Sequence, residues 1–210
     1  PLLAGAPVSE ADYPLDVKTN YKIDLNDNFK DNKLSLLWQT QANPKKYWFS
    51  FNKGLVLNCI KTDACDLHLV PQILTQKVPA LEFDTKTLIE LDNLKENDAV
   101  GFTMMGTNYT YIEIKRIDNK LELSLYEGSF NTHDICVFKE EYQDNKIILG
   151  LKARNEAIYD LRYQYTINGK EIEKSYLASA GRWIGATYGL YARGNGGSAL
   201  VKYFNTTKLK

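Results

Sequence analysis

An alternation of apolar and polar residues with a period of two runs through most of this chain. The segment LEFDTKTLIEL at residues 81–91 shows the alternation most clearly. One face of this segment carries Leu81, Phe83, Thr85, Thr87, Ile89 and Leu91. The opposite face carries the charged side chains Glu82, Asp84, Lys86 and Glu90, with Leu88 as the one exception. A half-solvated antiparallel strand requires this pattern, whereas a helix would repeat every 3.6 residues.

The same alternation recurs at short intervals, and no segment shows a convincing helical period. Strands are expected on either side of Pro44 within residues 34–51, at 54–60, 73–76, 100–105, 109–116, 121–126, 135–142, 147–154 and 158–167, and twice within 181–204. Asn168-Gly169 and Gly106-Thr107-Asn108 have the composition of hairpin turns. The pattern predicts an all-β fold, an antiparallel β-sandwich or jelly roll with little or no helix.

Two regions of different character divide the chain. Residues 1–22 hold three of the six prolines and little periodicity, so we expect them to be an extended linker from an upstream domain. The alternation begins with Tyr21, Ile23 and Leu25, which we expect on one face of a first strand. A single sandwich domain is therefore expected at residues 23–210. The start at Pro1, with no Met and no signal sequence, indicates a processed form or an excised piece.

Charge and hydropathy argue against two classes of partner. Lys plus Arg and Asp plus Glu each number 26, so the formal net charge is zero. No basic cluster reaches the density that a phosphate backbone would need. No apolar run approaches the roughly 20 residues that span a bilayer. We therefore expect neither nucleic acid nor a membrane as a partner.

The cysteines and histidines do not indicate a disulfide framework or a zinc site. Three cysteines are too few for such a framework, although Cys59 and Cys65 could pair across a short loop. The favoured interpretation makes Cys59 and Cys136 small buried residues at strand positions. His68 and His133 are the only histidines and have no zinc-ligand spacing.

One polar turn imitates a calcium-binding loop. Asp24, Asn26 and Asn28 stand at the first three ligand spacings, but Phe29 and Ser35 replace the glycine and the glutamate that such a loop needs. A solvated turn is the favoured interpretation and an irregular structural calcium site is the alternative. No other cofactor is expected.

Catalytic constellations are weak in this sequence. Ser50, Ser129 and Ser179 lack a Gly-x-Ser-x-Gly context, and two histidines leave little choice of general base. Glycoside hydrolysis needs two carboxylates about 5 to 9.5 Å apart, but most acids here fall on the solvent side of alternating strands or in turns. We expect no enzymatic activity from this chain alone.

Aromatic side chains close to planar amides are the most distinctive chemistry. The candidate contact residues lie in three segments: Trp38, Gln39, Gln41, Asn43, Tyr47 and Trp48; Tyr109; and Arg182 with Trp183. A pyranose ring stacks its C–H face on Trp or Tyr, and its hydroxyl groups bond to amide or guanidinium groups. Sandwich cores also contain Trp and Tyr with satisfied polar groups, so a core position is the alternative for each aromatic.

Several of these residues fall in motifs that resemble one protein family. The motifs are Asp27-x-Phe29 followed by Leu34, Trp38-Gln39-x-Gln41-Ala42-Asn43-Pro44, Leu74-x-Gln76-Lys77-x-Pro79-Ala80 with Phe83, the stretch from Gly101 to Tyr109, and Gly181-Arg182-Trp183-Ile184-Gly185-Ala186. Together they span most of the chain. They resemble the C-terminal concanavalin A-like β-sandwich of family 43 glycoside hydrolases, the β-xylosidase and α-arabinofuranosidase group, also classed as carbohydrate-binding module family 91.

The resemblance implies an accessory role beside a catalytic domain. In such enzymes the catalytic carboxylates belong to a five-bladed propeller, on which the sandwich packs. Its loop between the first strands reaches toward the sugar pocket and maps onto residues 42–47, where this chain has Lys45 and Lys46. The implied partners are a xylan-type polysaccharide or oligosaccharide and a cognate family 43 catalytic domain, in a bacterial, extracytoplasmic setting.

Two functions stay open at this point. The first is a non-catalytic module that binds xylan or arabinoxylan. The second is a structural module that packs on the propeller and shapes its active-site entrance without sugar affinity of its own.

Overall fold

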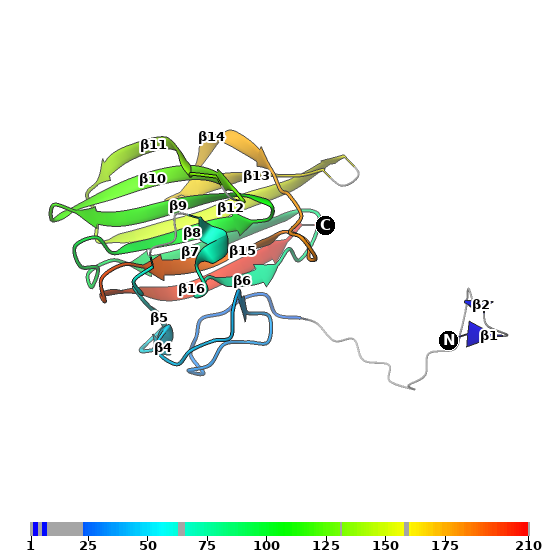
Figure 1. The fold of residues 1–210 in the computed structure, drawn as a ribbon, viewed down its shortest axis with the longest axis horizontal. Helices are drawn as coiled ribbons and strands as arrows, with labels where there is room; N and C mark the ends of the chain where they lie inside the picture. Colours follow the sequence, from blue (N-terminus) through cyan, green and yellow to red (C-terminus); the bar gives the residue numbers. More distant parts are fainter. Residues whose placement is uncertain are drawn as a thin grey trace.

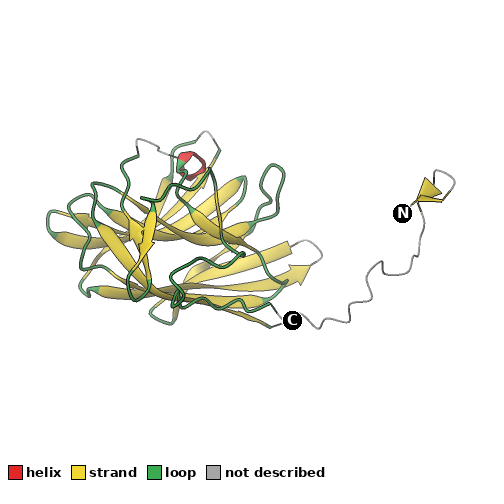
Figure 2. Ribbon diagram, turned by 90° about the horizontal axis from the view of Figure 1, so that it is seen from below, coloured by secondary structure: helices red, strands yellow, loops and turns green. Residues whose placement is uncertain are grey.

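Two seven-stranded antiparallel sheets pack face to face in the computed structural model, which describes residues 2–3, 6–7, 23–62, 66–130, 132–157 and 160–209 (Figures 1 and 2). In the first sheet the order is β11 (Ile135–Tyr142), β10 (Lys120–Ser129), β9 (Asn108–Ile117), β8 (Ala99–Met105), β15 (Thr187–Arg193), β6 (Leu74–Lys77) and β3 (Gln39–Thr40). In the second it is β14 (Lys170–Leu177), β13 (Asp160–Ile167), β12 (Lys146–Ala157), β7 (Phe83–Glu90), β16 (Ser198–Lys208), β5 (Leu55–Asn58) and β4 (Phe49–Phe51). The predicted antiparallel sandwich is confirmed.

The predicted linker falls almost entirely outside the described residues. Within residues 1–22 the structure describes only β1 (Leu2–Leu3) and β2 (Ala6–Pro7), which pair antiparallel with each other. The boundary expected near residue 22 therefore stays a prediction.

The first expected strand is wrong over its described part. Residues 23–26 have no regular structure, Ile23 is half exposed, and Asp27 makes only an isolated bridge to Phe204. The side chains of Asp24 and Asp27 each accept a hydrogen bond from the backbone N–H two residues ahead, at 3.0 and 2.9 Å. Such local bonds compete with strand pairing, and alternation alone does not reveal them.

The same turn accounts for the imitation of a calcium loop. The Asn28 side chain accepts a bond from the Lys30 backbone N–H at 3.2 Å, and Asn26 Oδ1 accepts one from the Thr206 N–H at 3.2 Å. These oxygens cap backbone donors of the turn and of β16.

The main core lies between the two sheets, and the alternation explains it. In β7 the residues Phe83, Thr85, Thr87 and Ile89 are buried, while the residues between them are partly or fully exposed. The predicted turn at Asn168-Gly169 joins β13 and β14, with φ of 49° and 82°. Asn and Gly adopt such positive φ angles at little cost, which fixes the register of this hairpin.

A second hydrophobic cluster covers the outer face of the first sheet. The short helical turn η1 (Leu67–Leu69) is the one helical segment among the described residues and is red in Figure 2. It lies outside the sandwich. The residues around it pack on outward-facing side chains of the sheet, and the cluster consists of Leu67, Val70, Ile73, Met105, Tyr109, Tyr111 and Tyr191. All seven residues of β8 are buried as a result, because both of its faces are covered.

The cysteines match expectation only in part. Cys59 is buried, whereas Cys136 is exposed on the edge strand β11, which corrects its predicted burial. A strand at the edge of a sheet loses cover on its outer face, and sequence alternation does not show which strand lies there. Cys65 lies outside the described residues. Among those residues no helix is long and apolar enough to cross a membrane.

Candidate functional site

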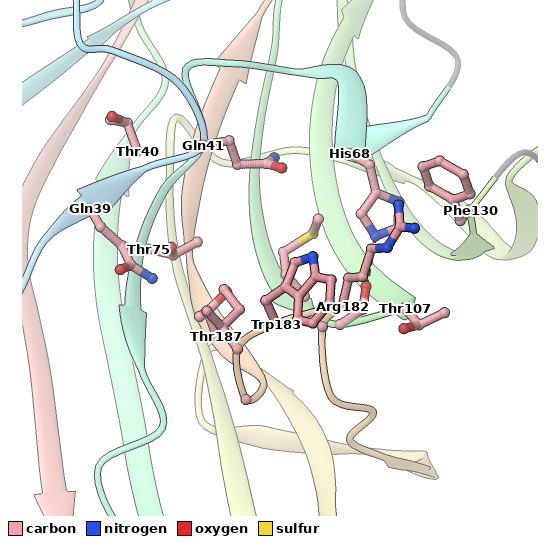
Figure 3. Close-up of a pocket in the computed structure, with 15 residues that line it drawn as sticks. Gln39, Thr40, Gln41, His68, Thr75, Thr107, Phe130, Arg182, Trp183 and Thr187 are labelled. Atoms are coloured by element: carbon pink, nitrogen blue, oxygen red, sulfur yellow. Dashed lines mark hydrogen bonds between the residues drawn. The ribbon is translucent and has the colours of Figure 1, made fainter.

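A large pocket lies on the outer face of the first sheet, beside the η1 segment. Its volume is about 710 Å³. Gln39 and Gln41 stand on one side and His68 and Phe130 on the other, with Trp183 between them (Figure 3). The lining residues are Gln39, Thr40, Gln41, His68, Thr75, Met105, Gly106, Thr107, Phe130, Gly181, Arg182, Trp183, Ile184, Gly185 and Thr187.

The floor of the pocket is rigid because three adjacent strands supply it. Thr75 of β6, Met105 of β8 and Thr187 of β15 are buried and line the pocket. The register pairs Thr187 with Met105 across the β15–β8 ladder. The floor therefore combines a thioether with two hydroxyl groups at positions fixed by the sheet.

One wall is tied to the segment that covers the sheet. The amide Nε2 of Gln41 donates to the carbonyl oxygens of Leu67 and Val70, at 2.9 and 3.2 Å. These bonds hold the end of β3 against η1. Gln39, at the start of β3, also lines the pocket, and no hydrogen bond of its side chain is recorded within the described part of the chain.

His68 forms part of the opposite wall and is held on both sides. Its Nδ1 lies 2.9 Å from Asp66 Oδ1, and its Nε2 lies 2.7 Å from the Gly106 carbonyl oxygen. Its ring packs edge-on against Tyr109 and Phe130, with centroid distances of 4.9 and 5.7 Å. Both ring nitrogens are engaged, so this side chain shapes the pocket and is not a free general base.

The fourth side of the pocket is a loop that presents a nearly uncovered indole. Residues 178–186 pass from β14 in the second sheet to β15 in the first. Trp183 is 89% exposed and Ile184 is 52% exposed. The base of the loop is fixed, because the N–H and the hydroxyl of Thr107 both donate to the Ala180 carbonyl oxygen at 2.9 Å. An anchored loop thus carries an aromatic surface that the protein itself leaves free.

Four of the nine residues expected at a contact site meet at this pocket. Gln39, Gln41, Arg182 and Trp183 all line it, although about 140 positions separate the two pairs in sequence. Asn43 and Tyr47 are exposed and do not line it.

The other three expected contact residues are buried, which corrects their assignment. Trp38 is 9% exposed, donates its Nε1–H to Asp27 Oδ2 at 2.9 Å and packs edge-on against Phe204 at 4.8 Å. Trp48 is 4% exposed. Tyr109 is 1% exposed, because η1 covers it. Each is packed within the protein, which was the alternative left open for the aromatics.

The Tyr109 hydroxyl belongs to a network that holds the covering segments in place. Tyr109 and Tyr111 donate to the two carboxylate oxygens of Asp134, each at 2.6 Å, and Tyr109 accepts from the Leu67 N–H at 3.2 Å. Gly128 makes room for this network, since an added Cβ would lie 2.3 Å from Asp134 Oδ1 and 2.4 Å from the Tyr109 ring. Burial, followed by the bonds to Asp134, raises the pKa of Tyr109.

A buried ion pair lies further along the same face. Glu113 Oε2 accepts from the Tyr191 hydroxyl at 2.8 Å and from Arg193 Nε at 3.0 Å. Burial, the largest single cause, lowers the pKa of Arg193, but the Glu113 carboxylate together with Tyr191 and Tyr111 outweighs it and raises the pKa overall. The pair neutralises two charges beneath the cover and takes no part in lining the pocket.

His68, Phe130, Met105 and the threonines of the pocket were not among the residues predicted from the sequence. Thr75, Met105 and Thr187 face outward in alternating strands, where they look like ordinary surface residues. Only the fold of residues 66–73 over the sheet shows which part of that face stays open. Thr187 could have been predicted to line the site, because it closely follows the Arg182-Trp183 pair in the sequence.

The lining groups are suited to stacking and hydrogen bonding. None of the described residues that line the pocket is Asp or Glu, the residue types that supply the paired carboxylates of glycoside hydrolysis. No three His, Cys, Asp or Glu side chains within the described ranges lie close enough together to hold a metal ion.

Comparison with known families identifies the domain. Residues 26–207 match the family model described as the β-xylosidase C-terminal concanavalin A-like domain. The chain belongs to this family. The match covers nearly all of the sandwich of this concanavalin A-like domain, in agreement with the resemblance seen in its motifs. A comparison with curated protein sequences gave no match.

Solved structures share the fold of the concanavalin A-like domain at low sequence identity. One is a family 43 glycoside hydrolase engineered to display both endo-xylanase and exo-arabinofuranosidase activity, with a TM-score of 0.78, 17% identity, and coverage of 94% of this chain and 44% of that chain. Another is the xylan β-1,4-xylosidase of Bacillus halodurans, with a TM-score of 0.73, 12% identity and coverage of 97% and 43%.

A third structure is a separate binding module of similar size. It is the carbohydrate-binding module CBM66 of Bacillus subtilis, with a TM-score of 0.52, 9% identity, and coverage of 82% of this chain and 96% of that chain. By contrast, the chain spans less than half the length of the two hydrolases. These likenesses show the fold, and the ligand has to be argued from the site.

Proposed function

We propose that this domain is a non-catalytic module that binds xylan- or arabinoxylan-type chains at the pocket beside Trp183. The observation that carries the proposal is an indole left 89% exposed at the edge of a pocket of about 710 Å³. Large aromatic side chains lose free energy when they stay in water, so an uncovered Trp at a pocket indicates a ligand surface. The flat C–H face of a pyranose fits such a surface.

The polar lining supports a sugar in preference to a purely apolar ligand. The amide of Gln39, the hydroxyl groups of Thr75 and Thr187 and the guanidinium of Arg182 surround the indole. Amides and hydroxyl groups both donate and accept hydrogen bonds, which matches the hydroxyl groups of a sugar. Because these contacts are few and partly solvated, we expect millimolar to micromolar dissociation constants, roughly 4 to 8 kcal/mol of binding free energy.

The choice of xylan rests on the relatives. The matched family is named for β-xylosidases, and one structural neighbour is a xylan β-1,4-xylosidase. The module would hold the polymer while a family 43 catalytic domain of the parent protein hydrolyses it, in an extracytoplasmic compartment where such polymers occur.

Calorimetry with the domain tests this proposal. Titration with xylohexaose and soluble arabinoxylan should give saturable heat, and Trp183→Ala should weaken binding at least about ten-fold, as loss of a central aromatic contact does. Tyr47→Ala is the matched control, because Tyr47 is 56% exposed and does not line the pocket. No heat from either ligand, or equal losses in the two variants, would show the proposal to be wrong.

A second candidate function has an observation of its own. Leu36 is fully exposed, and Tyr47, which is 56% exposed, lies in the loop of residues 42–47 that the resemblance places toward a catalytic domain. A structural module that docks through this region would shape the active-site entrance without binding sugar. In the full-length parent enzyme, Leu36→Ser with Tyr47→Ser should then lower turnover of a small aryl xyloside, whereas Trp183→Ala should not.

A further inference from the structure

Trp183 stands between two hollows. The second hollow has a volume of about 430 Å³ and shares Trp183, Ile184 and Gly185 with the main pocket. Its other lining residues come from the end of β6, from β13 and from the loop after β14: Lys77, Val78, Leu161, Ala178, Ser179, Ala180 and Ala186. The two hollows are therefore contiguous, and together they form a groove that crosses the seam between the sheets. A chain of several sugar residues fits such a groove better than a single sugar.

The permanently charged side chains among the described residues of this groove are all positive. The chain has 26 acidic residues, yet none of the described residues that line either hollow is Asp or Glu. Each hollow contributes one permanent cation, Arg182 in the first and Lys77 in the second. Both side chains are exposed, and neither makes an ion pair or a recorded hydrogen bond within the described part of the chain.

Cations elsewhere on the sandwich show the contrast. On the outer face of the second sheet, Lys152 pairs with Glu171 and Arg154 pairs with Asp84. On the first sheet, Lys120 pairs with Glu141. Lys152, Arg154 and Lys120 thus each have an acidic partner, whereas the described residues of the groove include cations on both sides of Trp183 and no carboxylate.

We propose that the groove binds a xylan-type chain that carries uronate substituents, with the backbone stacked on Trp183 and a carboxylate held by Arg182 or Lys77. This inference rests on the proposed sugar-binding function and specifies its ligand. A guanidinium presents two parallel N–H groups to a carboxylate, and an ammonium attracts it as a point charge. Since both cations are exposed, water screens the attraction, and the expected gain is about two- to five-fold in affinity.

The test compares two ligands that differ by one methylglucuronate branch, and the salt dependence and the charge-removing variants then isolate the contribution of its carboxylate. Xylotetraose, and xylotetraose with one methylglucuronate branch, are titrated into the domain at low ionic strength by calorimetry. The branched ligand should bind about two- to five-fold more tightly. This ratio of affinities should shrink toward one in 0.5 M salt, because salt screens exposed charges.

Variants then locate the carboxylate. Arg182→Gln or Lys77→Gln should bring the ratio close to one, and the double variant should abolish the preference. Lys86→Gln is the matched control: Lys86 is an exposed residue of β7 on the second sheet and lines neither hollow, so the preference should persist. The ratio for each variant is compared within that variant, so a change in its affinity for the neutral sugar does not affect the result.

The outcomes separate this inference from the function on which it rests. If both tetraoses bind equally, or if the preference survives in the double variant, the uronate inference is wrong while sugar binding stands. If tetragalacturonate binds more tightly than the branched xylotetraose, the ligand is a polyuronate and the inference is also wrong. If neither tetraose binds, both proposals are contradicted.

Discussion

Trp38 and Trp183 are the same residue type in opposite settings. Trp38 is 9% exposed, with its indole N–H bonded to Asp27 and its ring against Phe204. Trp183 is 89% exposed on a loop whose base alone is anchored. The first side chain stabilises the sandwich, and the second is available to a ligand.

Substitution should separate these two roles. Trp38→Ala should lower the free energy of unfolding by about 3 to 5 kcal/mol, because it removes a large core side chain. Trp183→Ala should change it by less than about 0.5 kcal/mol, as expected for an exposed position. Urea unfolding followed by circular dichroism measures both values, and a large loss for Trp183→Ala would show that this residue packs on the protein.

Asp98 is a buried acid with a structural role. It is fully buried, and its carboxylate oxygens accept the backbone N–H groups of Lys95 and Asn195. Asp98→Asn turns one acceptor into a donor that faces a backbone N–H, so we expect roughly 2 kcal/mol of destabilisation. Asp92→Asn is the control, since Asp92 is exposed and accepts its bond from the Asn145 side chain. Equal effects in thermal or urea unfolding would contradict this account.

At the scale of elements, the alternation predicts strands well and their cover poorly. Most expected strands occur within a few residues of their predicted bounds, because a half-buried strand and its period-two pattern have the same physical cause. The pattern does not tell which strands join which sheet. It also does not show that residues 66–73 cover the outer face, so the burial of Tyr109 could not be foreseen.

The candidate site was likewise predictable only in part from the sequence. Arg182 and Trp183 were found because an aromatic side chain next to a planar hydrogen-bonding group suits a sugar, and both line the pocket. Trp48 has the same composition signal and is buried, since exposure depends on contacts between distant strands.

The cover over the first sheet depends on one carboxylate. Asp134 accepts from both Tyr109 and Tyr111, and Tyr109 in turn accepts the Leu67 N–H of η1. Asp134→Ala leaves two buried hydroxyl groups without their acceptor, so we expect roughly 3 kcal/mol of destabilisation. Hydrogen exchange should accelerate in residues 66–73.

A double-mutant comparison checks the cause. In a background with Tyr109→Phe and Tyr111→Phe, the same Asp134→Ala substitution should cost much less, because no hydroxyl groups remain to be satisfied. An unchanged cost in that background would mean that Asp134 acts through other contacts.

At the scale of the whole molecule, two sheets enclose an aromatic-rich core that contains many hydroxyl groups. The chain has 14 tyrosines. Burial, the largest cause in each case, raises the pKa of Tyr163, Tyr165, Tyr188 and Tyr191 in the folded state. The folded protein therefore retains protons that the unfolded chain releases above about pH 10.

Stability should consequently fall at alkaline pH. The contribution of these buried tyrosines to the free energy of unfolding is fully present below the unfolded tyrosine pKa of about 10. It decreases as the pH rises beyond that value, since the unfolded state then binds fewer protons than the folded state. The absorbance of the ionised buried tyrosines should appear at the same pH at which the far-ultraviolet circular dichroism signal is lost. Gradual ionisation of these tyrosines with the fold intact would contradict the expectation.

The uneven exposure of the three tryptophans also gives the molecule a built-in optical probe. Trp38 and Trp48 are buried, so a collisional quencher such as iodide should reach Trp183 almost alone. A sugar stacked on that indole would exclude water from it and should shift its emission to shorter wavelength while protecting it from the quencher. Occupancy of the groove can therefore be followed by intrinsic fluorescence without any label, and Trp183→Phe should remove the signal.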